Sequence, residues 1–513
     1  MEQYLNRIYN KVKTAEELAN ILGTPPRKEP VVMCHGTFDI VHPGHLRHLF
    51  YAKEKGKVLV VSVTADKYVY KGDDRPYVPQ ELRAKNLAAM ELVDYVVVDY
   101  NETPIQNILV IKPDYFIKGF EYRQDDIHTK TKEEIKAVSS YGGEVIFSPG
   151  DTVYSSTHLL KVHKPKIGLD KLVSLMEAEK VSFNDLLKTL DKMKDIKVHV
   201  VGDVIVDKYS YCSVLGPTTK TPTFSVKFES SETFLGGAGI VAKQVKSLGA
   251  DVTLTTVLGD DKLKDYVLED LRRAEIRTNA IIDHTRPTTQ KERFWADGYK
   301  LLQVDTVDNS IVSEKILEEL TEYISKEKAD IAVFSDFRHG IFRRETIRGM
   351  IRVIDSNTVK VADSQVSNRW GNILEFNGFD IIFPNEKEAR FALGDQDTGV
   401  RPLAGKLYKK SGTKYLMLKL GEKGILVYRD ASESPRDFFF IDSFVEDIVD
   451  SLGAGDAMLA ATSLAYRASK NIMISSIIGN AAAALACEVE GNVPITISAI
   501  KSKINWIASN KFA

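Results

Sequence analysis

The chain is poor in cysteine, which excludes several kinds of structure. Only three of its 513 residues are cysteines. Their wide spacing excludes a disulfide framework and a four-cysteine zinc site, so we expect a reducing, cytoplasmic environment. An excess of charge of one sign is also absent, because 69 Lys and Arg against 71 Asp and Glu leave a formal net charge of −2. That balance argues against nucleic-acid binding as the main role.

Long apolar runs are missing as well. The N-terminus is charged throughout and lacks the apolar core of a signal peptide. The most membrane-like stretch, Ile472 to Ala486, is short and rich in Ala and Ser, whereas a membrane span needs about 20 apolar residues. This stretch therefore predicts a buried helix, and we expect no membrane partner. The composition, 43% hydrophobic and 27% charged residues, is typical of a soluble globular protein.

Strands that alternate with helical segments predict an α/β protein with two domains. We predict a first domain over residues 1–160 that includes a helical leader ending at Gly23, a charged helical linker over 161–196, and a second domain over 197–513. Apolar runs typical of buried parallel strands lie at 31–33, 57–65, 94–100 and 143–149, and then at 196–203, 251–259, 330–336, 380–385 and 415–421.

The string His-Gly-Thr-Phe-Asp-Ile-Val-His-Pro-Gly-His carries the first candidate site. His42 and His45 are three residues apart where a helix is predicted to begin, so they share one face. The free N–H groups and the dipole of a helix start bind anions. The two imidazoles can also donate hydrogen bonds to a phosphate as negative charge develops. The simpler alternatives are two solvated histidines or a metal site, which lacks further ligands nearby.

This string resembles the HxGH signature of the cytidylyltransferase-like nucleotidyltransferases, over about residues 30–160. The resemblance implies a small Rossmann-like parallel sheet. It also implies attack of a phosphorylated substrate on the α-phosphate of a nucleoside triphosphate, with His42, His45 and Lys71 as catalytic residues. It assigns nucleotide and phosphate binding to Gly36, Thr37, Phe38, Arg83, Lys118, Gly119, Ser155, Ser156 and Thr157. The simpler alternatives are a solvated loop and helix face for the basic residues and a helix N-cap for the hydroxyl run.

The string Asp-Ser-Leu-Gly-Ala-Gly-Asp, which ends at Asp456, carries the second candidate site and precedes an Ala-rich helix. Small residues let the backbone approach a phosphate closely, and amides at a helix start can bind the charge of a transferred phosphoryl group. Asp456 on the first turn can accept a proton from a substrate hydroxyl. Alone, such a turn is more often a helix cap. No G-x-x-x-x-G-K-[ST] run is present, so a P-loop kinase is not supported.

This turn resembles the signature of the PfkB/ribokinase family of sugar kinases, over about residues 197–510. The resemblance implies a ribokinase-like α/β/α domain, ATP as phosphate donor, Asp456 as catalytic base, and Mg²⁺ held through water by Asn385 and Glu388. It assigns sugar binding to Asp203, Asp207, Gly236, Gly237 and Lys291, and phosphate and nucleotide binding to Lys419, Gly421, Gly424, Gly453, Ala454 and Gly455. The sequence differs from the family pattern at one position, because Ile240 stands where the family commonly has a sugar-contacting asparagine. This difference leaves the identity of the sugar substrate undetermined.

A sugar kinase joined to a nucleotidyltransferase suggests two consecutive steps. The pair resembles the bifunctional heptose kinase/adenylyltransferases of lipopolysaccharide precursor synthesis, with the domain order reversed. We expect ATP to phosphorylate a heptose 7-phosphate at O1, and AMP from a second ATP to be transferred to a sugar 1-phosphate; a phosphatase acting between the steps is left open. Two alternatives remain: another sugar or polyol phosphate that gives a CDP-linked product, and one silent domain that senses a ligand or serves assembly. A homodimer is also left open.

Overall fold

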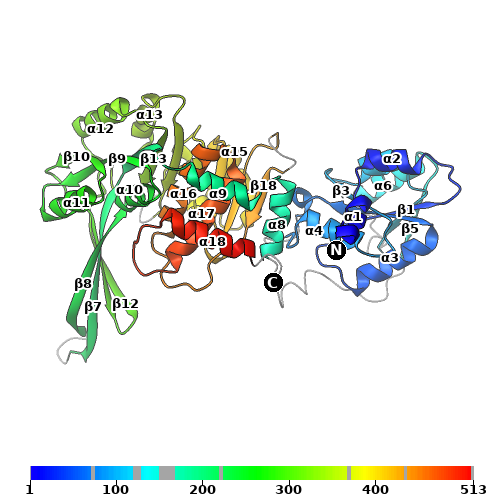
Figure 1. Ribbon diagram of the computed structural model, residues 1–513, viewed down its shortest axis with the longest axis horizontal. Coiled ribbons are helices and arrows are strands. Elements are labelled where there is room, and N and C mark those ends of the chain that lie inside the picture. Colours follow the sequence, from blue (N-terminus) through cyan, green and yellow to red (C-terminus); the bar gives the residue numbers. More distant parts are fainter. Residues whose placement is uncertain are drawn as a thin grey trace. The chain divides into compact units, whose positions relative to one another are not determined.

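The computed structural model describes residues 2–70, 75–119, 129–148, 168–218, 223–366, 371–432 and 436–509. The chain divides into two compact units, Met1–Ala178 and Glu179–Ala513 (Figure 1). The boundary falls inside the predicted linker. It assigns helix α8 (Gly168–Ala178) to the first unit and helix α9 (Phe183–Asp191) to the second.

The first unit is built on a five-stranded parallel sheet in the order β3-β2-β1-β4-β5. This order reverses direction beside β1, the arrangement in which ligands bind outside the carboxyl ends of the strands. The strands are β1 (Val31–Gly36), β2 (Val58–Thr64), β3 (Tyr95–Asp99), β4 (Tyr115–Lys118) and β5 (Glu144–Phe147). The helices besides α8 are α1 (Glu2–Lys11), α2 (Ala15–Leu22), α3 (Pro43–Lys55), α4 (Gln80–Ala88), α5 (Ile105–Ile111) and α6 (Thr129–Ser139).

The helical leader belongs to this sheet. Between α1 and α2 the chain forms a parallel bridge from Val12 to Val96 of the edge strand β3, and the Lys13 amide donates to the Val96 carbonyl at 2.9 Å. The Nζ of Lys11 donates to two carbonyls that follow α4. Helix α2 ends at Leu22, directly before the predicted stop at Gly23.

The second unit contains a nine-stranded sheet in the order β10-β9-β6-β13-β14-β15-β16-β17-β18. It is parallel from β10 to β16, and β17 and β18 add antiparallel strands. The strands are β6 (Lys197–Gly202), β9 (Asp251–Gly259), β10 (Arg277–Asp283), β13 (Ile331–Asp336), β14 (Val359–Ser364), β15 (Ile381–Ile382), β16 (Tyr415–Lys419), β17 (Ile425–Tyr428) and β18 (Phe438–Ile441). The helices besides α9 are α10 (Ala238–Ser247), α11 (Lys262–Arg273), α12 (Glu314–Lys326), α13 (Arg344–Arg352), α14 (Glu386–Leu393), α15 (Val400–Ser411), α16 (Ala454–Ser469), α17 (Ile472–Cys487) and α18 (Ile497–Ser509).

A separate four-stranded sheet in the order β12-β11-β7-β8 extends from this unit (Figure 1). It consists of β7 (Val204–Pro217), β8 (Phe224–Gly237), β11 (Gln290–Ala296) and β12 (Tyr299–Thr306). Strand β7 begins one residue after Asp203, and β8 ends at Gly237, so both long strands start or finish beside predicted sugar-binding residues.

Two structural expectations from the sequence are confirmed. The α/β class holds for both units, and the stretch beginning at Ile472 is the buried helix α17. All three cysteines are unpaired. Within the described parts of the chain, no helix is both long and apolar enough to cross a membrane. The strand predicted over 380–385 is shorter, since only Ile381 and Ile382 join the ladder.

Candidate active sites

The first candidate site lies where β1 ends and α3 begins. His42 is the N-cap of α3, and its Nδ1 accepts a hydrogen bond from the Gly44 amide at 3.2 Å. Because Nδ1 is an acceptor, a neutral His42 ring carries its proton on Nε2. Anions bind favourably at such a helix start.

His42 and His45 stack on each other. Their ring centroids are 3.9 Å apart at 20°, and the Phe38 ring lies 5.0 Å from that of His45. Burial lowers the pKa of His42. Burial, followed by the neighbouring His42 and His48, lowers the pKa of His45 to about 4. Near neutral pH the His45 ring is therefore uncharged and carries a single N–H.

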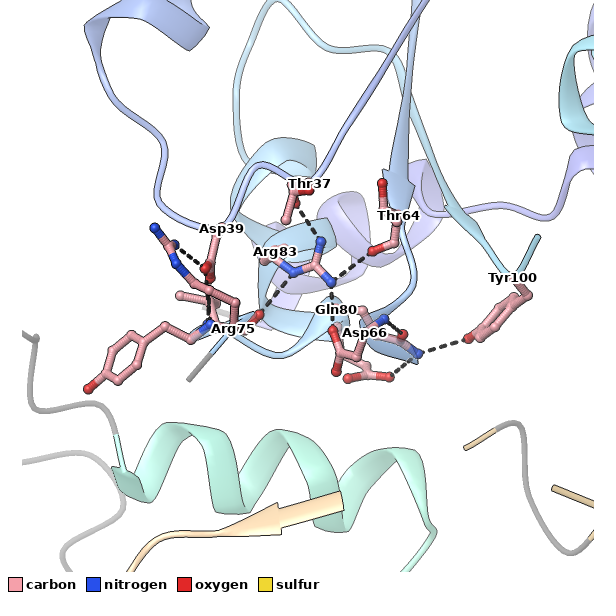
Figure 2. Close-up of polar contacts among 11 residues, drawn as sticks. Thr37, Asp39, Thr64, Asp66, Arg75, Gln80, Arg83 and Tyr100 are labelled. Atoms are coloured by element: carbon pink, nitrogen blue, oxygen red, sulfur yellow. Dashed lines mark hydrogen bonds and ion pairs between the residues drawn. The ribbon is translucent and has the colours of Figure 1, made fainter. Parts of the chain in front are cut away.

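The predicted basic residues of this unit have different surroundings. Arg83 is fully buried, and its guanidinium donates to three backbone carbonyls and to Asp66 (Figure 2). It therefore holds the protein's own backbone in this conformation. Lys118 pairs with Glu134 and donates to Thr131 Oγ1 at 3.3 Å, with Gly119 directly after it. The predicted Lys71 and the run Ser155, Ser156 and Thr157 lie outside the described residues.

Two polar residues near this site had no assigned role in the sequence. Asp39 is buried and binds Arg75 together with the amides of Tyr77 and Val78. His35 contacts Ser62 Oγ at 2.9 Å and Thr64 Oγ1 at 3.2 Å. Burial, and then the charge of Lys118, lowers its pKa to about 3. Both residues lie inside the motif, but their partners are far along the chain, so no local pattern could reveal these contacts.

The second candidate site lies at the start of α16. Gly453 is the N-cap residue with φ 77°, and a Cβ there would come within 2.4 Å of Asn492 Oδ1, so glycine is required. Ala454 and Gly455 form the first turn, and Asp456 follows as a partly exposed residue. Desolvation of its carboxylate, followed by the charge of Asp363, raises the pKa of Asp456 to about 8.

Lys419, the last residue of β16, lies among carboxylates that converge on this site. Its Nζ is 2.7 Å from Asp363 Oδ2. Burial alone would lower its pKa, but the charges of Asp363 and Glu388 outweigh that effect and raise it. Burial raises the pKa of Glu388 to about 7, although the charge of Lys419 opposes the change. After Lys419 the chain turns through Gly421 (φ 60°) and Gly424 (φ 92°) into β17.

The carboxylates around Lys419 offer oxygen atoms, the type of ligand that Mg²⁺ prefers. Asp363 Oδ1 is buried and has no hydrogen-bond partner in the described structure, so one acceptor is left for a hydrated cation. Asn385 and Glu388 form a reciprocal capping box at the start of α14, which fits contact through water rather than direct coordination. Among the residues described, no group of three or more His, Cys, Asp or Glu could hold a metal.

The predicted sugar-binding carboxylates lie beside the two glycines. A Cβ on Gly236 would approach Asp207 Oδ2 to 2.1 Å, and one on Gly237 would approach the Asp203 carbonyl to 2.2 Å. Asp207 pairs with Arg293 and also accepts a hydrogen bond from Asn492 at 3.4 Å. Asn492, which also approaches Gly453, therefore links the predicted sugar side to the α16 turn.

Asp203 is held by the loop after β13. Its Oδ2 accepts hydrogen bonds from the amides of Phe337 at 2.8 Å and His339 at 3.3 Å. Burial, and then the charge of Asp336, raises its pKa to about 7. Ile240 is buried in α10 and offers no polar group to a sugar.

Three basic residues gather on the face of the four-stranded sheet that carries Asp207. Lys291 of β11 lies opposite Asp207 of β7, and Arg293 reaches the same carboxylate. Burial, and then the charge of Arg293, lowers the pKa of Lys300 on β12. Arg293, Lys300, Asp363 and Asn492 were not predicted as site residues, because single polar residues without a motif give no signal.

Comparisons with known proteins agree with this geometry. Residues 195–497 match the family described as pfkB family carbohydrate kinase, and residues 33–167 match the family described as cytidylyltransferase-like. These positions are consistent with the predicted order, in which the nucleotidyltransferase-like domain comes first.

The curated relatives include the bifunctional protein HldE of Sulfurimonas denitrificans, 26% identical over 314 residues, with 60% of this chain and 63% of that protein covered. The HldE of Campylobacter fetus subsp. fetus is 28% identical over 320 residues, with 60% of this chain and 67% of that protein covered. The match therefore spans less than two thirds of the length of the first of these relatives.

Among solved structures, the tetrameric inhibited form of Escherichia coli phosphofructokinase-2 resembles this chain with a TM-score of 0.51 at 15% identity, covering 61% of this chain and 99% of that one. The same enzyme in complex with substrates and products gives 0.51 at 16% identity over the same shares. These likenesses support a ribokinase-like fold for the second unit. The chain belongs to the pfkB family of carbohydrate kinases and carries a cytidylyltransferase-like domain ahead of its kinase domain.

Proposed function

We propose that this protein is a bifunctional enzyme that makes a nucleotide sugar, with a sugar kinase in the second unit and a nucleotidyltransferase in the first. The kinase part is carried by one observation. Asp456, Lys419 and Asp363 converge at the start of α16, while Asn492 connects that turn to Asp207 on the predicted sugar side.

In the kinase reaction the sugar hydroxyl gives its proton to Asp456, and its oxygen attacks the γ-phosphorus of ATP as ADP leaves. A pKa of about 8 suits a carboxylate that must accept a proton near neutral pH. The amides of the α16 turn and the Lys419 ammonium would stabilise the negative charge of the transferred group. Mg²⁺, held through water near Asn385 and Glu388, would neutralise charge on the ATP phosphates.

In the second reaction a sugar 1-phosphate oxygen attacks the α-phosphorus of a nucleoside triphosphate, and pyrophosphate leaves. The protein needs to supply only placement and hydrogen bonds, because the substrate is itself the nucleophile. The stacked His42 and His45 at the α3 start would donate those hydrogen bonds as charge develops on the phosphate.

The basic face of the four-stranded sheet favours a sugar that already carries a phosphate. Lys291, Arg293 and Lys300 lie on the face that holds Asp207, and an anionic group on the sugar would complement them. Together with the likeness to HldE, this supports a heptose 7-phosphate phosphorylated at O1, followed by transfer of AMP from ATP.

A second candidate keeps both reactions but uses another sugar or polyol phosphate with CTP, giving a CDP-linked product. The buried apolar Ile240 favours it, since the sugar loses a polar partner at that position. Screening sugar phosphates with ATP and with CTP separates the two candidates.

The test follows ADP formation from candidate sugar phosphates and, in a separate assay, pyrophosphate release from a supplied sugar 1-phosphate, using the full chain with ATP and with CTP. Asp456→Asn should lower ADP formation by about 1,000-fold, because it removes the proton acceptor. His45→Ala should lower pyrophosphate release by about 100-fold. Each variant is the control for the other, because each should leave the other activity intact. Loss of both activities in either variant would contradict the assignment of one reaction to each unit.

A further inference from the structure

Arg83 is a fully buried arginine whose partners come from three segments of the first unit. Its Nε donates to the Val78 carbonyl at 2.9 Å, before α4. One guanidinium nitrogen donates to the Thr37 carbonyl after β1 (Figure 2). The other donates to the Thr64 carbonyl at the end of β2 at 2.8 Å and to Asp66 Oδ1 at 2.6 Å. A buried charge is costly unless it is paired and hydrogen-bonded. Moving any of these acceptors away from Arg83 would therefore cost free energy, so the network restrains both the guanidinium and the backbone segments that bind it.

The Thr37 end of this network leads to the histidine pair. Phe38 follows Thr37 with φ 49°, a left-handed conformation that a bulky residue adopts only when its surroundings enforce it. In this conformation the buried Phe38 ring packs on His45, which stacks in turn on His42. One residue with a left-handed backbone, Phe38, therefore links the Thr37 carbonyl to the His45 ring.

Asp39, the residue after Phe38, is also anchored by hydrogen bonds. Its carboxylate pairs with Arg75 and accepts the amides of Tyr77 at 3.0 Å and Val78 at 2.8 Å (Figure 2). Val78 is shared by the two networks, because its amide binds Asp39 and its carbonyl binds Arg83. The turn 37–39 is thus fixed at both ends to the segment that begins α4.

We propose that Arg83 is a positioning residue that sets the placement of the His42–His45 pair through Thr37 and Phe38. It does so from inside the protein, so its role in the reaction does not depend on touching the phosphate. This inference rests on the proposed nucleotidyltransferase function.

Arg27 offers a matched control near the amino ends of the strands of the same sheet, whereas Arg83 lies beside their carboxyl ends. It is also nearly buried, and it donates to the carbonyls of Leu22, Gly23, Ile111 and Lys112 and to Asp114, just before β4. Arg27→Gln therefore removes an arginine that also binds several backbone carbonyls and one aspartate, but at the end of the strands that lies away from the histidines.

The experiment compares Arg83→Gln, Arg83→Lys and Arg27→Gln in the full chain, with urea denaturation as the folding control for the first unit and ADP formation as the check that the kinase unit is unaffected. Arg83→Gln should lower kcat for pyrophosphate release by about 100-fold with little change in nucleotide KM, since a misplacement of about 1 Å can cost that much. Arg83→Lys should recover little, because lysine lacks the planar fork. Arg27→Gln should keep kcat within about threefold, as expected for a site outside the network.

Proton NMR titration of the histidines gives a readout that does not depend on turnover. In Arg83→Gln the pKa of His45 should rise toward its ordinary value as the ring loses its buried position, and in Arg27→Gln it should not. If Arg83→Gln fails to fold, Phe38→Leu breaks the same chain of contacts without unpairing a buried charge and should give the same kcat loss and His45 shift.

Two results would overturn the inference. In one, Arg83→Gln matches Arg27→Gln in kcat and in the His45 titration, which would make Arg83 merely structural. In the other, nucleotide KM rises while kcat is kept, which would mean direct phosphate binding. A wild-type chain that releases no pyrophosphate would contradict the proposed function instead, and the His45 titration would still decide the role of Arg83.

Discussion

Arg83 in the first unit and Lys419 in the second both lie beside the carboxyl ends of parallel strands, but they bind different kinds of acceptor. Three of the four acceptors of Arg83 are backbone carbonyls. Lys419 binds Asp363 and lies in the field of Glu388 and Asp456. The first cation therefore fixes the path of the backbone, whereas the second balances the charge of acidic side chains.

The groups proposed to react show the same contrast. Burial lowers the pKa of His45 to about 4 and raises that of Asp456 to about 8, so desolvation favours the neutral form in both units. A neutral imidazole can still donate a hydrogen bond, but a neutral carboxyl cannot accept a proton. If Asp456 is the base, as proposed, it therefore depends on a cation such as Lys419 to stay ionised, whereas the histidine pair does not.

The largest effect should come from removing that cation. Lys419→Met leaves Asp363, Glu388 and Asp456 without their common counter-charge and should lower ADP formation by about 1,000-fold. It should also lower the free energy of unfolding by about 3 kcal/mol, measured by urea denaturation. Lys503→Met is the control, because Lys503 is equally buried between Glu446 and Glu488. It should lose stability but retain kinase activity, and equal loss of activity in both variants would contradict a specific role for Lys419.

A smaller effect should follow from adding one methyl group beside each site. Gly236→Ala would place a Cβ 2.1 Å from Asp207 Oδ2 and should lower kcat/KM for the sugar by about 100-fold. In Gly36→Ala the nearest atoms to the new Cβ belong to the Phe38 ring, at 3.1 Å, so pyrophosphate release should fall by less than about 10-fold. Gly349→Ala meets nothing within 4 Å and serves as the control. Steady-state kinetics of both reactions test this order, and a larger loss in Gly36→Ala would reverse it.

The smallest effect is a difference in pH dependence. Asp456 must be ionised to accept a proton, and its folded-state pKa is about 8, so kcat/KM for ADP formation should rise about 10-fold per pH unit below pH 8 and level off above it. Pyrophosphate release should show no change from the titration of His45 above pH 6, because His45 is already neutral there.

Asp363→Asn sharpens the pH test. The charge of Asp363 raises the pKa of Asp456, so its removal should shift the rising limb of ADP formation to lower pH. Initial rates of both products in one buffer series give the two profiles. Identical profiles for the two products would contradict the contrast between the sites.

The sequence predicted the elements that are buried and periodic. The run at 251–259 coincides with β9, because strands buried on both faces of a parallel sheet have continuous apolar sequences that can be recognised without the structure. Strands β7 and β8 were not predicted, since segments such as Lys-Phe-Glu-Ser-Ser-Glu-Thr are mostly polar and exposed. Their pairing comes from strand partners and not from local apolar character.

The motifs identified the groups proposed to take part in chemistry but not the groups that hold them. Asp456 and His45 belong to recognisable strings, and the structure places each at a helix start. Asp363 and Asn492, which contact Lys419 and Asp207, come from distant segments of the chain. Only the folded structure brings them to the site, so no local sequence pattern could identify them. Arg83 shows the limit most clearly, because an arginine in a basic motif predicts a phosphate contact, whereas its described partners are backbone carbonyls and Asp66.

The bridge between Val12 and Val96 has a consequence for handling the protein. Strand β3 is the outer strand of its sheet, and an uncovered outer strand offers unpaired backbone groups to strands of other molecules. The leader covers part of that edge by giving the Lys13 amide to the Val96 carbonyl. Deleting the first 13 residues would therefore promote self-association at β3, and light scattering would detect it even if both chemical steps were unaffected.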